Sequence, residues 1–282
     1  MEKCKYCENG QAIKNSHAIP SFIYKWLRDT STNGFMRATN EPNQRLQDGP
    51  RSPLLCTKCE LLFSKFENKF KTEFFSKVAN YRKPYPEILP ITESTKKCIS
   101  IISWRVLADT YFFPKENEYT KDEFDKFPSI LKQIKESIQS SETTDNPIHL
   151  IPCTQEILIR LNLPKVDFFY YDRTIGAEPR IWDDWQRLII FIKIPFSIIV
   201  FEAVPGKNDP WVGTRIDNVD SIHLSGILSV PDYVAPQINR GYKSFLEYND
   251  RMSPEQKKKI MEDAVKSDKN CGSFKTMSKV WP

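Results

Sequence analysis

The chain has 282 residues, enough for one or two domains with a sizeable core, and its 40% hydrophobic and 27% charged content is typical of a globular protein. No run of 18 apolar residues occurs, which argues against a membrane-spanning helix. The formal net charge of +5 is concentrated in residues 1–82, which hold 14 Lys and Arg against 8 Asp and Glu. This excess is compatible with phosphate contacts but does not establish a nucleic-acid partner.

Two cysteine pairs with the same spacing, Cys4-x-x-Cys7 and Cys56-x-x-Cys59, lie in the N-terminal fifth of the chain. Each pair can present two thiolates to one tetrahedral Zn²⁺, and the repeated spacing favours a shared zinc over four unrelated buried thiols. The total of seven cysteines is odd, and no signal peptide precedes the first of them. We therefore expect reduced thiols in a cytoplasmic protein rather than a set of disulfides.

The first predicted element is a short hairpin over residues 3–19. Asn9-Gly10 is typical of a tight turn, and the segment after it is expected to be a strand that delivers His17. A helix over residues 22–28 follows, with apolar residues along one face. This helix lengthens the gap between His17 and the second cysteine pair.

The rest of the N-terminal module is predicted to be a turn-rich loop, a short strand and a helix, over residues 30–53, 54–56 and 59–80. Glu60 and Glu67 are seven positions apart on this helix, so both are expected on one face, which can point at His17. Prolines after residue 82 end the helix, and the predicted domain boundary lies there.

Residues 83–282 are expected to form a second, larger domain of mixed α+β structure. Its predicted elements are helices over 93–112, 121–140 and 154–161, strands over 166–171, 187–193 and 196–203, and a C-terminal helix over about 254–266. The last two strands are joined by two residues, too few for a crossover helix, so they are predicted to be antiparallel. The sequence indicates no function for this region.

The order of features in the N-terminal module resembles the HNH, or His-Me finger, endonucleases. Between the cysteine pairs lies Ser16-His17-Ala18-Ile19-Pro20, similar to the family's Asp-His-Ile-x-Pro context, and a helix follows the second pair. The resemblance covers about residues 1–80 and implies a zinc-bound ββα treble-clef finger in which the four cysteines hold the metal for structure. It also implies hydrolysis of phosphodiester bonds by one histidine and one divalent cation, Mg²⁺ or Mn²⁺. The expected fold class is thus α+β, with this finger followed by the larger domain.

By this resemblance, His17 is the general base that activates water, and Glu60 lies at the position that binds the catalytic metal. Ser16 stands where the family usually has Asp, and Glu60 where it usually has Asn or His. Asn43 is a candidate for the residue that braces the His-bearing loop, although its place after a proline is equally typical of a turn. Unless Glu67 or a loop group replaces the missing Asp, metal affinity is expected to be low.

Three arginines of the turn-rich loop, Arg37, Arg45 and Arg51, are candidates for phosphate contacts, although a solvated loop would carry the same residues. Nucleic acid, and DNA before RNA, is the expected partner, together with a protein that activates or targets the chain. The resemblance also suggests a setting in bacterial phage defence or a mobile element.

Each site residue also has a structural interpretation. His17 could be a hydrogen-bonded histidine packed on the finger, and Glu60 an acid favoured at a helix N-terminus by the macrodipole. The chain would then be a catalytically inactive zinc-finger module that binds nucleic acid or protein, or a structural subunit of a larger assembly. Metal-dependent nicking that is lost in His17→Ala separates the nuclease hypothesis from these alternatives.

Overall fold

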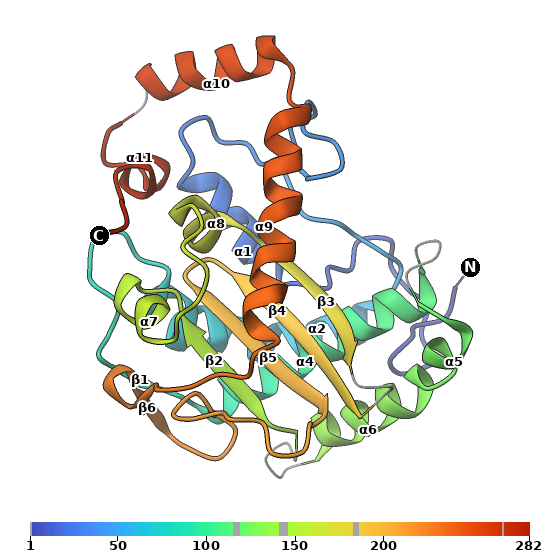
Figure 1. The fold of residues 1–282 in the computed structure, drawn as a ribbon. Coiled ribbons are helices and arrows are strands. Elements are labelled where there is room, and N and C mark those ends of the chain that lie inside the picture. Colours follow the sequence, from blue (N-terminus) through green and yellow to red (C-terminus); the bar gives the residue numbers. More distant parts are fainter. Residues whose placement is uncertain (1, 115–118, 141–145, 183–185, 267) are drawn as a thin grey trace.

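A computed structural model describes residues 2–114, 119–140, 146–182, 186–266 and 268–282. Within them the chain is a mixed α+β fold, with helices on both sides of a four-stranded sheet (Figure 1). The helical segments are α1 (Ser21–Asp29), α2 (Thr57–Phe70), the π-helical η1 (Lys71–Phe75), α3 (Ser76–Val78), α4 (Glu93–Phe112), α5 (Lys121–Phe124), α6 (Phe127–Gln139), α7 (Gln155–Arg160), α8 (Phe168–Arg173), the 3₁₀ turn η2 (Leu224–Gly226), α9 (Val234–Arg251), α10 (Pro254–Lys266) and α11 (Gly272–Met277). The strands are β1 (Ile88–Pro90), β2 (Ile148–Pro152), β3 (Gly176–Trp182), β4 (Arg187–Ile194), β5 (Ser197–Val204) and β6 (Ser221–His223). None of the described helices combines the length and the apolar character needed to cross a membrane.

The central sheet has the strand order β2-β5-β4-β3, and every neighbouring pair is antiparallel. β4 and β5 are joined by a tight turn at Pro195 and Phe196, where Phe196 has a φ of 63° and Ile194 pairs with Ser197. This hairpin confirms the antiparallel pairing predicted from the short link. A separate two-stranded sheet pairs β1 with β6.

The two faces of the central sheet differ in polarity, because side chains alternate between faces along each strand. Ile190 and Phe201 lie opposite each other on an apolar face that packs with α4. The other face carries Glu202 and, on β3, Glu178, which accepts a hydrogen bond from Gln237 of α9. Helix α9 accordingly crosses the sheet on the side away from α2 and α4 in Figure 1. Polar side chains are thus gathered on the face of the sheet that α9 crosses.

Helix α4 lies in the core and joins the N-terminal module to the sheet. The side chain of Thr92 caps its N-terminus, as predicted, and the helix packs against α2, α6 and the sheet. The ring of Tyr6, between the first two cysteines, contacts Trp104 of α4 and Phe63 of α2 at centroid distances of 5.0 and 4.8 Å. One cluster of buried side chains therefore extends across residues 82 and 83, where the sequence predicts a domain boundary.

Most of the predicted helices are confirmed. α4 and α10 have the predicted bounds, β4 differs by one residue at its C-terminal end, and α1, α7 and β5 differ by one residue at each end. The helix predicted over residues 121–140 is divided into α5 and α6. The helix predicted over residues 59–80 begins two residues earlier and continues as a π-helical segment from Lys71. β2, β3 and α9 were not predicted from the periodicity.

The strand predicted over residues 166–171 is wrong, because most of this segment forms helix α8. The carboxylate of Asp167 accepts a hydrogen bond from the backbone N–H of Phe169 at 2.7 Å and so caps the helix. Phe168 stacks on Trp281 of the C-terminal segment with 4.4 Å between ring centroids. The aromatic residues that suggested a strand are thus buried by a tertiary contact, which overrides their local β preference.

The chain before α2 forms isolated backbone bridges where a hairpin was predicted. The short strand predicted over residues 54–56 is an extended segment: Leu54 and Leu55 accept backbone hydrogen bonds from Lys5 and Ile13 at 2.7 and 2.8 Å. These bonds tie the segment before the second cysteine pair to the turn that carries the first. The finer assignment as a treble clef stays a prediction.

Lys193 of β4 is buried on the polar face of the sheet, where only 3% of the residue is exposed. Its Nζ donates hydrogen bonds to the backbone oxygens of Tyr171 and Ile194 at 2.6 and 2.7 Å. Burial lowers the pKa of this amine to about 8, although Cys153 and Asp172 act in the opposite direction. The folded protein therefore gives up this proton at a lower pH than the unfolded chain, whose lysine has the ordinary pKa of 10.5.

We expect this difference to make the free energy of unfolding rise between pH 8 and 10.5, where the unfolded chain binds more protons at Lys193 than the folded protein does. Lys193→Met removes the titrating group, so its stability relative to the wild type should fall by about 2–3 kcal/mol between pH 7 and pH 10. Urea denaturation at both pH values measures this change. The exposed Lys165→Met is the control and should follow the wild type; the same behaviour in Lys193→Met would contradict the shifted pKa.

Candidate metal centre and neighbouring polar site

The four cysteines of the two pairs are close enough together to bind a metal ion. One Sγ atom from each of Cys4, Cys7, Cys56 and Cys59 lies within 4.8 Å of the others, and the Sγ atoms of Cys7 and Cys56 are 3.7 Å apart. Tetrahedral zinc with Zn–S bonds of about 2.3 Å requires sulfur–sulfur distances of about 3.8 Å. The cluster therefore fits zinc, and four thiolates would fill its coordination shell. Among the residues that the structure describes, these cysteines form the only such group of three or more potential metal ligands.

Local backbone structure brings the two pairs together. Cys56 is the residue before the first turn of α2, and Cys59 lies within that turn. In the first pair, the backbone N–H of Cys4 donates to the oxygen of Gly10 at 2.7 Å, which closes the turn. A Cβ atom at Gly10 would lie 2.7 Å from the Sγ of Cys56, so only glycine fits beside the cluster. The predicted Asn-Gly turn thus has a second function, which is to let the backbone approach the sulfur atoms.

The thiols of the cluster differ in acidity. Burial acts to raise the pKa of Cys7, but hydrogen bonds from the backbone of Asn9 and Gly10 outweigh it and lower this pKa to about 6. Burial raises the pKa of Cys59 well above its ordinary value, and contacts with Cys56 and Cys7 add to this rise. Metal binding requires thiolates, so loading of the cluster is expected to release protons.

The imidazole of His17 faces the loop that precedes the second cysteine pair. Its Nε2 lies 3.1 Å from Oδ2 of Asp48, a contact of ion-pair length that lacks hydrogen-bond geometry. Asp48 is held by the backbone N–H of Gly49, 2.8 Å from Oδ1, and by the guanidinium of Arg51. The side chains of His17 and Asp48 are 13% and 30% exposed, so the pair lies at the edge of the protein surface.

Asp48 is expected to be ionised at neutral pH. Its partial burial acts to raise its pKa, but the hydrogen bonds from Arg51 and Gly49 and the nearby His17 outweigh this effect and lower the pKa below its ordinary value of 3.8. A carboxylate beside Nε2 favours the tautomer that carries its proton there, which leaves Nδ1 as the acceptor. Sequence analysis missed Asp48, because nothing in a turn-rich loop marks which acid will meet His17.

The two acids predicted on one face of α2 both pair with Arg105 of α4. Nη1 of Arg105 donates to Oε1 of Glu67 at 2.5 Å, and Nη2 donates to Oε2 of Glu60 at 3.0 Å. Nη1 also donates to the backbone oxygen of His17 at 3.2 Å. A single guanidinium therefore connects both acids with the histidine loop. Sequence analysis also missed Arg105, although an arginine inside a helix that is apolar on several sides is a signal for a buried ion pair.

Ser16 and Asn43 have other contacts than those expected from the family resemblance. Ser16 is fully buried, and its Oγ accepts a hydrogen bond from the backbone N–H of Leu55 at 3.1 Å. The side-chain oxygen of Asn43 accepts from the backbone N–H of Ser253, at the start of α10, at 2.8 Å. Ser16 thus ties the histidine loop to the segment before the second cysteine pair, and Asn43 ties the turn-rich loop to the C-terminal region.

The three loop arginines are engaged within the protein. Arg37 donates to the side chain of Gln256, and Arg45 lies 3.8 Å from the carboxylate of Asp263, both on α10. Arg51 pairs with Asp48, as described above. Arg37 and Arg45 therefore lie against α10, and Arg51 supports Asp48, the partner of His17.

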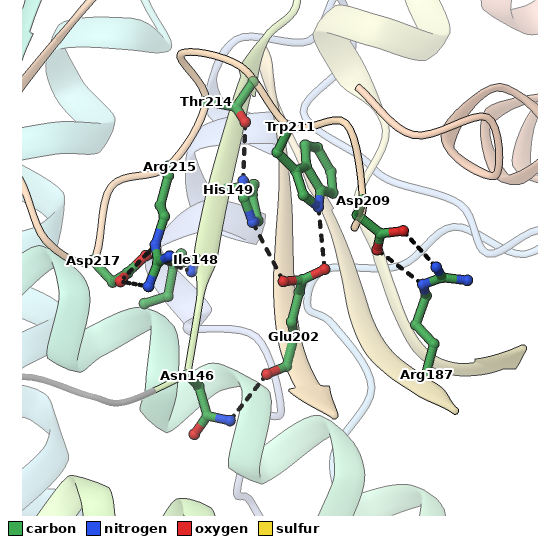
Figure 2. Close-up of polar contacts among 10 residues, drawn as sticks. All are labelled: Asn146, Ile148, His149, Arg187, Glu202, Asp209, Trp211, Thr214, Arg215 and Asp217. Carbon is green, nitrogen blue, oxygen red and sulfur yellow. Dashed lines mark hydrogen bonds and ion pairs between the residues drawn. The ribbon is translucent and has the colours of Figure 1, made fainter. Parts of the chain in front are cut away.

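A second polar cluster lies on the polar face of the sheet (Figure 2). Nε1 of Trp211 donates to Oε1 of Glu202 at 3.1 Å, and Oε2 of Glu202 lies 3.5 Å from Nε2 of His149. The indole of Trp211 stacks on His149 with 3.8 Å between centroids, and Nδ1 of His149 is 2.9 Å from the hydroxyl of Thr214. His149 and Glu202 are only 2% and 3% exposed. The imidazole and the carboxylate are thus buried beneath Trp211, and we assign the cluster to the stability of the sheet and its covering loop.

Comparison with known proteins identifies no relative: no protein-family model, curated protein or solved structure matches this chain. The conclusion that stands on the geometry is a mixed α+β protein with a four-cysteine cluster able to bind a metal.

We expect the purified protein to contain one zinc ion per chain. Cys56→Ser should lose the metal and lower the thermal unfolding temperature, because it removes one thiolate and metal binding contributes directly to folding. Mass spectrometry of bound metals and thermal denaturation with and without a chelator measure both effects. Cys271→Ser, at a partly exposed cysteine outside the cluster, is the control and should retain zinc. Folded wild-type protein without zinc would contradict this assignment.

Proposed function

We propose that this chain is a divalent-cation-dependent endonuclease of the HNH, or His-Me finger, type, in which the four cysteines hold a structural zinc. Its substrate would be a phosphodiester bond of nucleic acid, with DNA favoured over RNA. The observation that carries this proposal is the meeting of a partly exposed His17–Asp48 pair with Glu60, through Arg105, beside the cysteine cluster.

The residues of this site suit the parts of a hydrolytic reaction. With its proton on Nε2, beside the carboxylate of Asp48, His17 can accept a proton from water at Nδ1, which makes it a candidate general base. Asp48 would then stabilise the imidazolium that forms. Phosphodiester hydrolysis also needs neutralisation of charge on the phosphoryl group and the leaving oxygen, which a bound divalent cation supplies.

The donor set can hold such a cation, although weakly. Oε1 of Glu60 is buried without a hydrogen-bond partner among the residues that the structure describes, and a carboxylate oxygen is the kind of ligand that Mg²⁺ and Mn²⁺ prefer. Ser16 replaces the usual Asp and is occupied by Leu55, so one anionic ligand is missing. Mn²⁺ should therefore support the reaction better than Mg²⁺, because Mg²⁺ demands hard oxygen ligands in near-ideal octahedral geometry.

A second candidate function is a zinc-containing module that binds nucleic acid or protein without cleaving it. The observation in its favour is that Arg105 already pairs with both Glu60 and Glu67 and so offsets one of their two negative charges. Salt-dependent binding of nucleic acid without cleavage in Mn²⁺ would support this alternative. In either case, the resemblance suggests a protein partner and a role in bacterial phage defence or a mobile element.

His17→Ala should lower the rate of Mn²⁺-dependent nicking of plasmid DNA by about 10²- to 10⁴-fold, the usual contribution of a general base. Zinc content and folding should be unchanged, because His17 is not a ligand in the cysteine cluster. The exposed His223→Ala is the matched control and should cleave like the wild type. Undiminished cleavage in His17→Ala would place the chemistry elsewhere, and the absence of any cleavage by the wild type would favour the binding module.

Asp48→Asn should lower the rate of Mn²⁺-dependent cleavage, because an amide lacks the negative charge that would stabilise the imidazolium formed when His17 accepts a proton. The measurement is kcat and KM with Mn²⁺, together with zinc content and the thermal unfolding temperature. An unchanged kcat in the folded variant would contradict a role of Asp48 in the reaction, and a variant that fails to fold would show that Asp48 serves the folding of the loop.

A further inference from the structure

The larger region contributes one side chain to the candidate site, and its role goes beyond the resemblance of residues 1–80. Arg105 lies on α4, outside the predicted finger, and is 1% exposed. Its guanidinium lies over the ring of Phe63 of α2, 5.2 Å from the centroid, with both carboxylates and the backbone oxygen of His17 around it. A buried arginine requires such partners, because an uncompensated charge away from water is costly.

The contacts of Arg105 restrict how the two acids can bind a cation. Its Nη atoms occupy Oε1 of Glu67 and Oε2 of Glu60, so a divalent ion bridging those oxygens would compete with the guanidinium for the same space. By contrast, Oε1 of Glu60 is buried and has no hydrogen-bond partner among the described residues. Arg105 therefore leaves one oxygen of each carboxylate without a bond to its guanidinium, and of these two only Oε1 of Glu60 is buried without a partner in the described part of the chain.

We propose that Arg105 is the positioning residue of the site and that Glu67 is its counter-ion rather than a metal ligand. Arg105 holds one oxygen of Glu60, which presents the other to the cation, and it holds the carbonyl of His17, which sets the loop that carries the imidazole. Carboxylates that ligate metals are commonly oriented by a hydrogen bond of this kind. This inference rests on the proposed function and revises the role of Glu67 that the resemblance implies.

The test is Mn²⁺ binding to the zinc-loaded, full-length protein, which electron paramagnetic resonance measures. Cleavage of nucleic acid is measured separately. Glu60→Gln should weaken Mn²⁺ binding by about 10-fold or more, because it removes the ligand. Glu67→Gln should change it by less than about threefold, because the amide oxygen still accepts the hydrogen bond from Arg105. Arg105→Lys should weaken it by about 10-fold, since an ammonium group lacks the planar fork that reaches all three acceptors.

The matched control is Arg173→Lys. Arg173 is also a buried arginine, 3% exposed, that donates to the N-terminal module, where it meets the backbone oxygen of Leu27 and the hydroxyl of Thr30. It makes no contact with the acids of α2 in the described structure, so its variant should bind Mn²⁺ like the wild type. Zinc content and the thermal unfolding temperature of every variant identify losses that come from misfolding, and Glu67→Gln remains decisive if Arg105→Lys does not fold.

Loss of Mn²⁺ binding in Glu67→Gln as large as in Glu60→Gln would make Glu67 a ligand and overturn the inference. Unchanged binding in Arg105→Lys, or a wild type without a Mn²⁺ site that depends on Glu60, would overturn it as well. If Mn²⁺ binding follows the expected pattern but the wild type cleaves no nucleic acid, the proposed nuclease function would be refuted and the positioning role of Arg105 would stand. If the wild type cleaves nucleic acid but Glu67→Gln loses Mn²⁺ binding while Glu60→Gln retains it, the nuclease function would stand and the positioning role of Arg105 would be refuted.

Discussion

The arrangement around His17 depends on one buried charge, the guanidinium of Arg105. The position of Arg105 on α4 limits the distance between α2 and α4, because both Glu60 and Glu67 of α2 must reach its guanidinium. The same group holds the backbone of His17. Removing Arg105 would leave both carboxylates without their counter-ion and the carbonyl of His17 without this donor, so the arrangement of all three groups depends on it. An interaction of this kind specifies geometry, whatever its net contribution to stability.

The cysteine cluster supplies a second constraint, which acts at the start of α2. Cys56 and Cys59 fix where this helix begins, and Glu60 is the next residue, so its direction follows from the position of the sulfur atoms. Arg105 then fixes the orientation of the carboxylate. The metal-binding cluster and the buried arginine together determine the position of the Glu60 side chain. The cluster acts from within the N-terminal module, and the arginine acts from the larger region.

The parts that were predictable from sequence are those that local pattern determines. The repeated cysteine spacing indicated the metal cluster, and the apolar periodicity and cap at Thr92 gave the bounds of α4. Asp48 was not predictable, because its meeting with His17 closes a loop of some thirty residues whose path depends on tertiary packing. The helix α8 was missed for the same reason: its aromatic residues favour a strand locally and are packed as a helix by the C-terminal segment.

Electrostatics also make the larger region part of the candidate site. The excess of positive charge in residues 1–82 suggested that their loop arginines would meet phosphate, yet Arg37 and Arg45 lie against α10. The acids of α2 are likewise paired with an arginine from α4. Since Arg45 and these acids have their charged partners outside residues 1–82, the charge count of the N-terminal module alone does not describe the field that a nucleic acid would meet. The proposed nuclease activity is therefore a question for the whole molecule, because α4 and α10 supply partners to the charged residues of the N-terminal module.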